Sequence, residues 1–149
     1  MPTQVLAIHE RLGNWARQIR PRVASWPVRV VETRSASDLA TALRQSACPL
    51  AIVDLDRWPA RMLSDLERVR EDSADALILV LDPDSTPGVS FLARELGATL
   101  VRSGFVSPVE VEGLLGRWLS VSRRRQSLAG WTDEAEAEPE PWDVILNRD

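Results

Sequence analysis

Acidic residues and the single histidine of the chain follow three short apolar runs: His9, Glu10, Asp54, Asp56 and Asp82. If these runs are parallel strands, their carboxyl ends meet at one edge of a sheet, where open α/β folds bind ligands. Carboxylate and imidazole groups gathered there could hold a divalent cation. The five residues lack the tight spacing of most metal sites, and the carboxylates could equally be solvated groups at strand ends. We therefore expect neither a metal nor a cofactor.

The residue inventory excludes two other kinds of chemistry. All 18 basic residues are arginine, so a phosphate-cradling loop that depends on lysine is ruled out. Cys48 and His9 cannot act as nucleophile and base, because one precedes a predicted strand and the other follows one, at opposite edges of the sheet. Cys48 is therefore assigned to the core.

Composition and charge limit the class of protein further. A chain of 149 residues is long enough for one domain plus a tail. Its net charge is −4. Its sequence pI of 5.1 argues against general nucleic-acid binding, which needs a positive field. One cysteine cannot form an internal disulfide, and no segment reaches about 18 uninterrupted apolar residues. We expect a cytoplasmic protein that binds neither nucleic acid nor membrane.

Short apolar runs alternate with helical patterns along the chain. The predicted strands are residues 5–8, 28–31, 50–53, 77–81 and 99–101. Apolar residues recur at helical spacing between them, and Ser35 or Ser37 can cap the second helix. Such alternation forms a parallel sheet with helices on both faces, because crossovers are right-handed. The expected fold is a doubly wound α/β sheet of five strands in the order 2-1-3-4-5.

The last predicted helix has the clearest start. Ser107 and Glu110 form a capping box around Pro108, which takes the first helical position. Apolar residues then recur on one face: Val111, Leu114, Leu115, Trp118 and Leu119. Three consecutive arginines at 123–125 complement the helix dipole and mark the expected end of the helix. Residues 1–125 are the predicted domain.

Residues 126–149 are a predicted acidic tail with a terminal apolar segment. The acidic residues between 133 and 140 make the tail too polar to order itself, so we expect it to be flexible. The apolar cluster at 142–146 either packs back onto its own domain or docks on a partner. We expect the tail to be dispensable for folding and to matter for association.

Residues 97–111 carry a Gly-Ala pair before the fifth predicted strand and a Ser-Pro-x-Glu helix start after it. The third run ends at Asp54 and is followed by Trp58-Pro59. In this order, these motifs resemble the receiver domains of response regulators, the CheY-like domains. The resemblance covers residues 4–121. It implies a flavodoxin-like fold with a phosphorylation pocket at the carboxyl edge of the sheet.

The chemistry that the resemblance implies is incomplete in this sequence. Receivers hold Mg²⁺ with two acids after the first strand and a phosphoacceptor aspartate; Glu10 and Asp54 match, but His9 replaces one acid. Asp82 stands where a serine or threonine binds the phosphoryl oxygens, and a carboxylate would repel that anion. The receiver lysine falls on Gly104, and the arginine two residues earlier is a poor geometric substitute. These five positions form a degenerate phosphorylation pocket.

Three functions are compatible with these residues. The first is a pseudo-receiver, a non-enzymatic module for protein–protein interaction or regulation that works without phosphorylation. The second is a divergent active receiver, phosphorylated slowly at Asp54 with Glu10 and Asp56 holding the metal. The third is a small flavodoxin-like ligand binder or enzyme that uses a crevice between His9 and Asp82. We favour the first function and expect no enzymatic activity.

A protein partner or a second copy of the chain is the expected ligand. Trp15 and Trp118 fall on helical apolar stripes and are assigned to the core. Receivers commonly dimerise through the fourth helix, the fifth strand and the fifth helix, where this chain has several arginines. The residues predicted to contact a partner are Trp58, Arg94, Arg102, Arg117, Trp131, Trp142 and Ile145.

Overall fold

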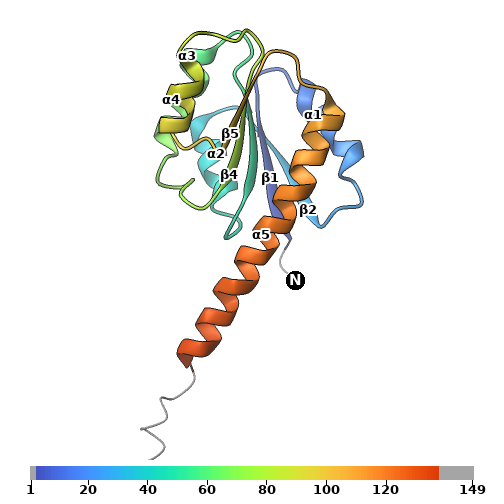
Figure 1. Ribbon diagram of the computed structural model, residues 1–149, viewed down its shortest axis with the longest axis vertical. Coiled ribbons are helices and arrows are strands. Elements are labelled where there is room, and N and C mark those ends of the chain that lie inside the picture. Colours follow the sequence, from blue (N-terminus) through green and yellow to red (C-terminus); the bar gives the residue numbers. More distant parts are fainter. Residues whose placement is uncertain (1–2, 138–149) are drawn as a thin grey trace, which may run out of the picture.

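The computed structural model of the protein describes residues 3–137, and within them five strands alternate with five helices. The strands are β1 (Gln4–His9), β2 (Val28–Thr33), β3 (Leu50–Asp54), β4 (Leu77–Asp82) and β5 (Leu100–Ser103). The helices are α1 (Asn14–Arg22), α2 (Ala36–Leu43), α3 (Pro59–Arg68), α4 (Val89–Glu95) and α5 (Pro108–Ala137). Neighbouring strands are parallel and follow the order β2-β1-β3-β4-β5, which confirms the predicted doubly wound sheet (Figure 1).

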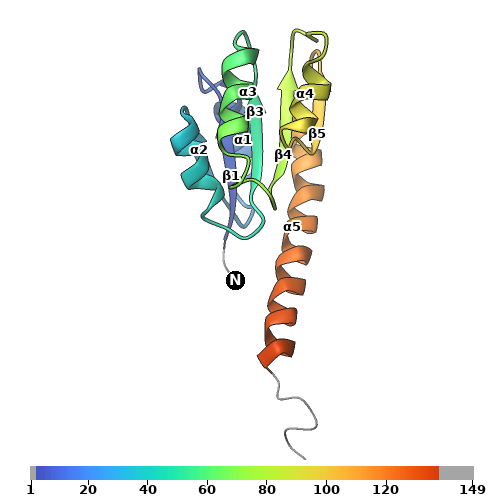
Figure 2. The ribbon, with the colours of Figure 1, turned by 90° about the vertical axis from the view of Figure 1, so that its left-hand side faces the viewer.

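Helices cover both faces of the sheet (Figures 1 and 2). The helices α2, α3 and α4 pack on one face, and α1 and α5 pack on the other. Side chains alternate along each strand, so Ala7 and Val53 face α2–α4, whereas Ile8 and Ile52 face α1 and α5. The central strands are buried along nearly their full length because both faces are covered. The same alternation directs the polar residues at the strand ends.

Local sequence signals explain where two of the helices begin. The Asp38 N–H donates to Ser35 Oγ at 3.1 Å, so Ser35 rather than Ser37 caps α2. The Glu110 N–H donates to Ser107 Oγ at 3.2 Å, as the predicted capping box requires. The Glu110 carboxylate, however, pairs with Arg102 instead of returning to Ser107. The capping box of α5 is therefore only half formed.

The helix α5 is longer than the sequence predicted. Its backbone continues to Ala137, whereas the expected end was the arginine run at 123–125. Residues 126–137 include three alanines, two glutamates, one glutamine and one leucine, which favour helix, and no proline interrupts them before Pro139. This part of the acidic segment is helical, although a flexible tail was expected, and the domain boundary at 125 stays a prediction. Neither α5 nor any other helix within residues 3–137 is long and apolar enough to cross a membrane.

Candidate functional site

Asp54 ends β3 at the carboxyl edge of the sheet and lines an open cavity of about 310 Å³. The other lining residues are Trp15, Gln18, Asp56, Leu81, Pro83, Gly104, Phe105, Val106 and Pro108. They come from α1, from β4, from the loops after β3 and β4, and from the turn into α5 together with the first residue of that helix. The Asp56 N–H donates to Asp54 Oδ1 at 3.1 Å. Among the described residues, the cavity is lined by two carboxylates and two aromatic rings, and by no basic side chain.

Burial raises the pKa of Asp54 to about 6. Hydrogen bonds from the Asp56 backbone and the Trp15 side chain act in the opposite direction, while the like charges of Asp56 and Glu10 raise the pKa further. The surroundings of Asp54 therefore favour its protonated form. An added phosphoryl group would bring more negative charge to a cavity that has no cation to balance it.

The Glu10 side chain serves as a cap for α1. It is only 2 % exposed, and its two carboxylate oxygens accept hydrogen bonds from the Trp15 N–H at 2.9 Å and the Ala16 N–H at 2.8 Å. The residue before α1 is Gly13, which has no side chain to cap the helix, so Glu10 satisfies the free amides instead. Both oxygens of Glu10 thus stabilise the fold, and a metal ion would have to compete with these bonds.

His9 points away from the Asp54 cavity, contrary to its expected place in the pocket. It is the last residue of β1 and lies on the same side as Ala7, which faces α2–α4. His9 is fully buried, with Nε2 2.8 Å from Asp65 Oδ2 and Nδ1 2.8 Å from Thr33 Oγ1. Burial lowers the pKa of His9 despite the opposing effect of the Asp65 carboxylate. A neutral ring therefore donates from Nε2 to Asp65 and accepts at Nδ1 from the Thr33 hydroxyl.

Asp82 also does not reach the Asp54 cavity. Its side chain is buried, and Oδ2 accepts a hydrogen bond from the Thr86 N–H at 3.0 Å, which fixes the turn after β4. Burial raises the pKa of Asp82. The predicted crevice between His9 and Asp82 is consequently not formed, because each side chain is enclosed and bonded to its own neighbours.

Gly104, at the position of the receiver lysine, has a backbone conformation that a lysine would resist. Its φ angle is +77°, in the left-handed region, and its N–H donates to the Asp82 carbonyl oxygen at 2.9 Å. A non-glycine residue there would cost on the order of 1 kcal/mol. Arg102, the nearest basic residue along the chain, is instead paired with Glu110 at 3.0 Å and does not line the Asp54 cavity.

The residues at this edge do not fit the Mg²⁺ site that the receiver resemblance implies. Glu10 is engaged as a helix cap, and His9 faces the opposite side of the sheet. Among the residues whose side chains are described, 3–128, no three His, Cys, Asp or Glu side chains converge to hold a metal ion. Asp54 and Asp56 are the two carboxylates that line the cavity, so a Mg²⁺ ion held there would take most of its ligands from water.

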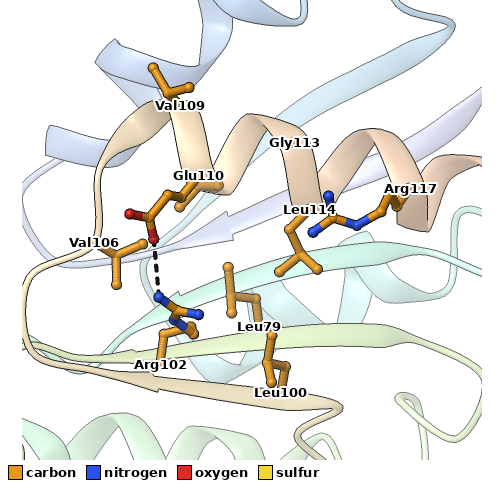
Figure 3. A pocket seen from close by; sticks show the side chains of 10 residues that line it. Leu79, Leu100, Arg102, Val106, Val109, Glu110, Gly113, Leu114 and Arg117 are labelled. Atoms are coloured by element: carbon orange, nitrogen blue, oxygen red, sulfur yellow. Dashed lines mark hydrogen bonds and ion pairs between the residues drawn. The ribbon is translucent and has the colours of Figure 1, made fainter.

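A second cavity, of about 320 Å³, lies between β5 and α5 (Figure 3). The side chains of Leu79, Leu100 and Leu114 point into it, and Arg102 and Arg117 stand near its rim. Two of the three arginines predicted to contact a partner thus line one cavity. The third, Arg94, is exposed on α4.

The tryptophans differ in how far they are covered. Trp58 is 36 % exposed, and the guanidinium carbon of Arg11 lies 4.6 Å from its ring centroid, so one ring face is covered. Trp118 packs partly buried against the core, as expected, and Trp15 does so while also lining the Asp54 cavity. The backbone of Trp131 is part of α5, and two further predicted contact residues lie outside the described residues: Trp142 and Ile145.

Sequence reasoning missed several residues that matter structurally. Phe105, next to Gly104, is 90 % exposed, more than any of the tryptophans with described side chains. Asp65 lies between Met62 and Leu66 on the apolar stripe of α3. A carboxylate at such a position predicts a buried side chain that needs a hydrogen-bonding partner. Ser122 is fully buried, and its Oγ donates to the carbonyl oxygen of Cys48 at 2.6 Å. Cys48 itself is buried, which confirms its assignment to the core.

Solved structures of receiver domains, and one of a putative pilus assembly protein, share this fold. A CheY-like receiver domain from Methanospirillum hungatei has a TM-score of 0.67 at 11 % identity, over 82 % of this chain and 98 % of that chain. A response regulator from Burkholderia pseudomallei, solved with a phosphorylated aspartic acid, has a TM-score of 0.62 at 17 % identity, over 96 % and 82 % of the two chains. A putative pilus assembly protein from Burkholderia thailandensis has a TM-score of 0.58 at 16 % identity, over 78 % and 98 %.

These comparisons establish the class of fold. No protein-family model matches the chain, and no curated protein matches it. The sequence identities to the solved structures are low, so the likeness concerns the backbone arrangement alone. The chain has the flavodoxin-like fold of response-regulator receivers, in agreement with the resemblance seen in its motifs.

Proposed function

We propose that this chain is a pseudo-receiver, a non-enzymatic signalling module that acts through contact with a protein and does not rely on phosphorylation. The observation that carries the proposal is the Asp54 cavity, which is lined by two carboxylates and by no described basic side chain. Phosphoryl transfer depends on groups that balance the charge of the transferred phosphoryl group. Gly104 in a left-handed conformation, in a chain without lysine, supplies no such group.

The positions around the cavity support the same interpretation. Glu10 and Asp82, which match receiver pocket positions, are bonded to backbone amides of the fold. In contrast, Arg94, Arg102 and Arg117 are exposed on α4, β5 and α5, where receivers commonly meet partners. A module with structural carboxylates and an open interaction face suits constitutive binding better than a phosphorylation switch.

The test is exposure of the protein to acetyl phosphate, or to beryllofluoride, with millimolar Mg²⁺. We expect an unchanged intact mass and unchanged tryptophan fluorescence. An active receiver domain treated in the same buffer serves as the positive control, and Asp54→Asn serves as the matched negative control. Stoichiometric labelling of Asp54, absent in the Asp54→Asn variant, would show that the pocket transfers phosphoryl groups and would overturn the proposal.

One observation favours a second candidate, a divergent active receiver. Asp54 is half-buried but lines an open cavity of about 310 Å³, so a small phosphodonor can reach it. This candidate predicts slow, Mg²⁺-dependent labelling that disappears in Asp54→Asn. The same mass measurements therefore separate the two functions.

A further inference from the structure

The C-terminal part of α5 extends beyond the sheet (Figures 1 and 2). The side chains of Val111, Leu115, Leu119 and Ser122 face the domain and are buried. Arg123, Arg124 and Arg125, which come next, are exposed. Residues 123–137 span about 21 Å at the rise of an α-helix. Gln126 still contacts Gln4 of β1, and the backbone of α5 continues from there to Ala137 beyond the sheet (Figures 1 and 2).

Charges of opposite sign are segregated along this part of α5. Three arginines occupy 123–125, and the acidic residues Asp133, Glu134 and Glu136 follow about three turns later. Side chains about ten residues apart on one helix are too distant to pair with each other. Within residues 3–128, whose side chains are described, none of the three arginines forms an ion pair. A second copy of the helix that runs in the opposite direction would place its acidic residues beside these arginines, and its arginines beside these acidic residues.

The helical period places these charges in register for such a pairing. Arg123 and Glu134 are eleven residues apart, close to three full turns, so the two positions lie on the same side of α5. Arg125 and Glu136 have the same spacing and share another side. An antiparallel second copy, related by a two-fold axis, brings each arginine beside the matching acid of its partner. A parallel copy would instead place arginines against arginines and acids against acids.

The two-fold axis of this register passes at the level of residues 129–130 along α5. By the helical period, heptad-spaced positions share one side of α5: 121, 124, 128, 131 and 135. Those with described side chains, Val121, Arg124 and Leu128, are exposed. In the antiparallel register, position 128 of one copy lies opposite position 131 of the other. Val121 and Leu128 are 37 % and 59 % exposed in the single chain, so this face has apolar surface to bury.

We propose that two copies of the chain associate through antiparallel pairing of residues 123–137 of α5. The inference rests on the proposed function in one respect, since it names the protein partner that such a module binds. It does not involve the Asp54 cavity. Labelling of Asp54 and association through α5 are measured separately, so either idea can fail without the other.

The experiment is sedimentation velocity over a concentration series at low and high salt. We expect a concentration-dependent dimer that weakens as salt screens the charges. Two charge-reversed variants, R123E/R124E/R125E and D133R/E134R/E136R, should each be monomeric at concentrations where the natural chain is dimeric. An equimolar mixture of the two should form a heterodimer, and a chain carrying all six substitutions should dimerise again.

A control with the same change of charge sits on the far side of the molecule. Arg57, Arg61 and Arg68 are exposed on or next to α3, which packs on the sheet face opposite α5. R57E/R61E/R68E should dimerise like the natural chain. A monomeric natural chain, or charge-reversed α5 variants that associate as tightly as this control, would overturn the proposal.

Orientation is tested with a spin label on Ser120→Cys, since Ser120 is exposed on α5 and the natural Cys48 is buried. Two labels should lie about 30 Å apart in an antiparallel dimer with this register. A separation of about 10 Å, the distance between neighbouring parallel helices, would reject the antiparallel arrangement.

Discussion

The Nε2 atom of His9 lies 2.8 Å from Oδ2 of Asp65, and this hydrogen bond joins the end of β1 to α3 inside the protein. A third member, Thr33, bonds the other ring nitrogen and adds β2 to the network. The histidine occupies a position that the receiver resemblance assigned to metal binding. In this chain it connects three elements of the fold instead.

We predict that breaking this pair from one side destabilises the protein more than removing both members. Asp65→Leu leaves the buried Nε2–H of His9 without an acceptor and should lower the free energy of unfolding by about 2–4 kcal/mol. The double variant His9→Leu/Asp65→Leu should recover part of that loss. Urea unfolding monitored by tryptophan fluorescence gives the coupling energy, expected at about 1–3 kcal/mol. The matched control is the exposed pair Arg44–Asp72, for which Asp72→Leu should cost less than about 1 kcal/mol.

Protonation of Asp54 should stabilise the fold. Its folded pKa of about 6 lies above the reference value of 3.8, so the folded state binds the proton more tightly than the unfolded state. The stabilisation is present at low pH and is lost as pH rises through about 6. Asp54→Asn should therefore raise the free energy of unfolding by about 1–2 kcal/mol at pH 7.5, a figure kept low because Asp54 retains contact with solvent.

The pH dependence of that gain is the decisive measurement. The advantage of Asp54→Asn over the natural chain should shrink as pH falls from neutral to about 4, where both carry a neutral side chain. Asp75→Asn, at an exposed position, is the control and should change stability by less than about 0.5 kcal/mol at either pH. An equal gain at both pH values would mean that Asp54 is not held in a site that disfavours its charged form.

His9 has the opposite effect on the pH dependence of stability. Because its pKa is lowered in the folded state, the free energy of unfolding should fall as pH drops below 6.5.

Substitution of Glu10 distinguishes a role in capping α1 from a role in binding a metal ion. We predict that Glu10→Ala lowers the free energy of unfolding by about 1–2 kcal/mol, because two amides at the start of α1 lose their acceptor. Millimolar Mg²⁺ should leave the melting temperature of the natural chain unchanged. A rise in melting temperature with Mg²⁺ that is lost in Glu10→Ala would show that Glu10 binds the metal. Sodium chloride at the same ionic strength is the control for general salt effects, because Ca²⁺ would bind the same carboxylate ligands as Mg²⁺.

The fold was predictable because its signals are local and repeated, whereas the site depends on side-chain direction. Apolar runs such as 50–53 predict the strands, and the alternation of these runs with helical patterns predicts that the strands are parallel. The sequence also places His9 and Asp54 at the same sheet edge. Their side chains nevertheless leave opposite faces, since His9 continues the alternation of Ala7 and Asp54 that of Ile52. Pairing of His9 with Asp65 across 56 positions requires the packed fold, which no local pattern reports.

At the end of α5 a local sequence signal was present but gave the wrong helix boundary. The arginines at 123–125 favour a helix C-terminus, yet the residues after them also decide whether the helix continues. Residues 126–137 contain strong helix formers and no proline, so the helix has no reason to stop at the arginines. Composition alone suggested a flexible segment because glutamate, which favours helix, is also enriched in disordered segments.

The last prediction concerns how much of α5 the domain needs. A chain ending at Ser127 keeps the buried Ser122–Cys48 bond and the Gln126–Gln4 contact with β1, so its melting temperature should fall by no more than a few degrees. A chain ending at Val121 exposes the Cys48 carbonyl and loses both contacts. It should lose about 2–4 kcal/mol of unfolding free energy, measured by urea titration with circular dichroism. If the chain ending at Ser127 melts many degrees lower or aggregates, residues beyond 127 belong to the domain core. Their expected role in association would then have to be abandoned, because surface needed for folding is not free to bind a partner.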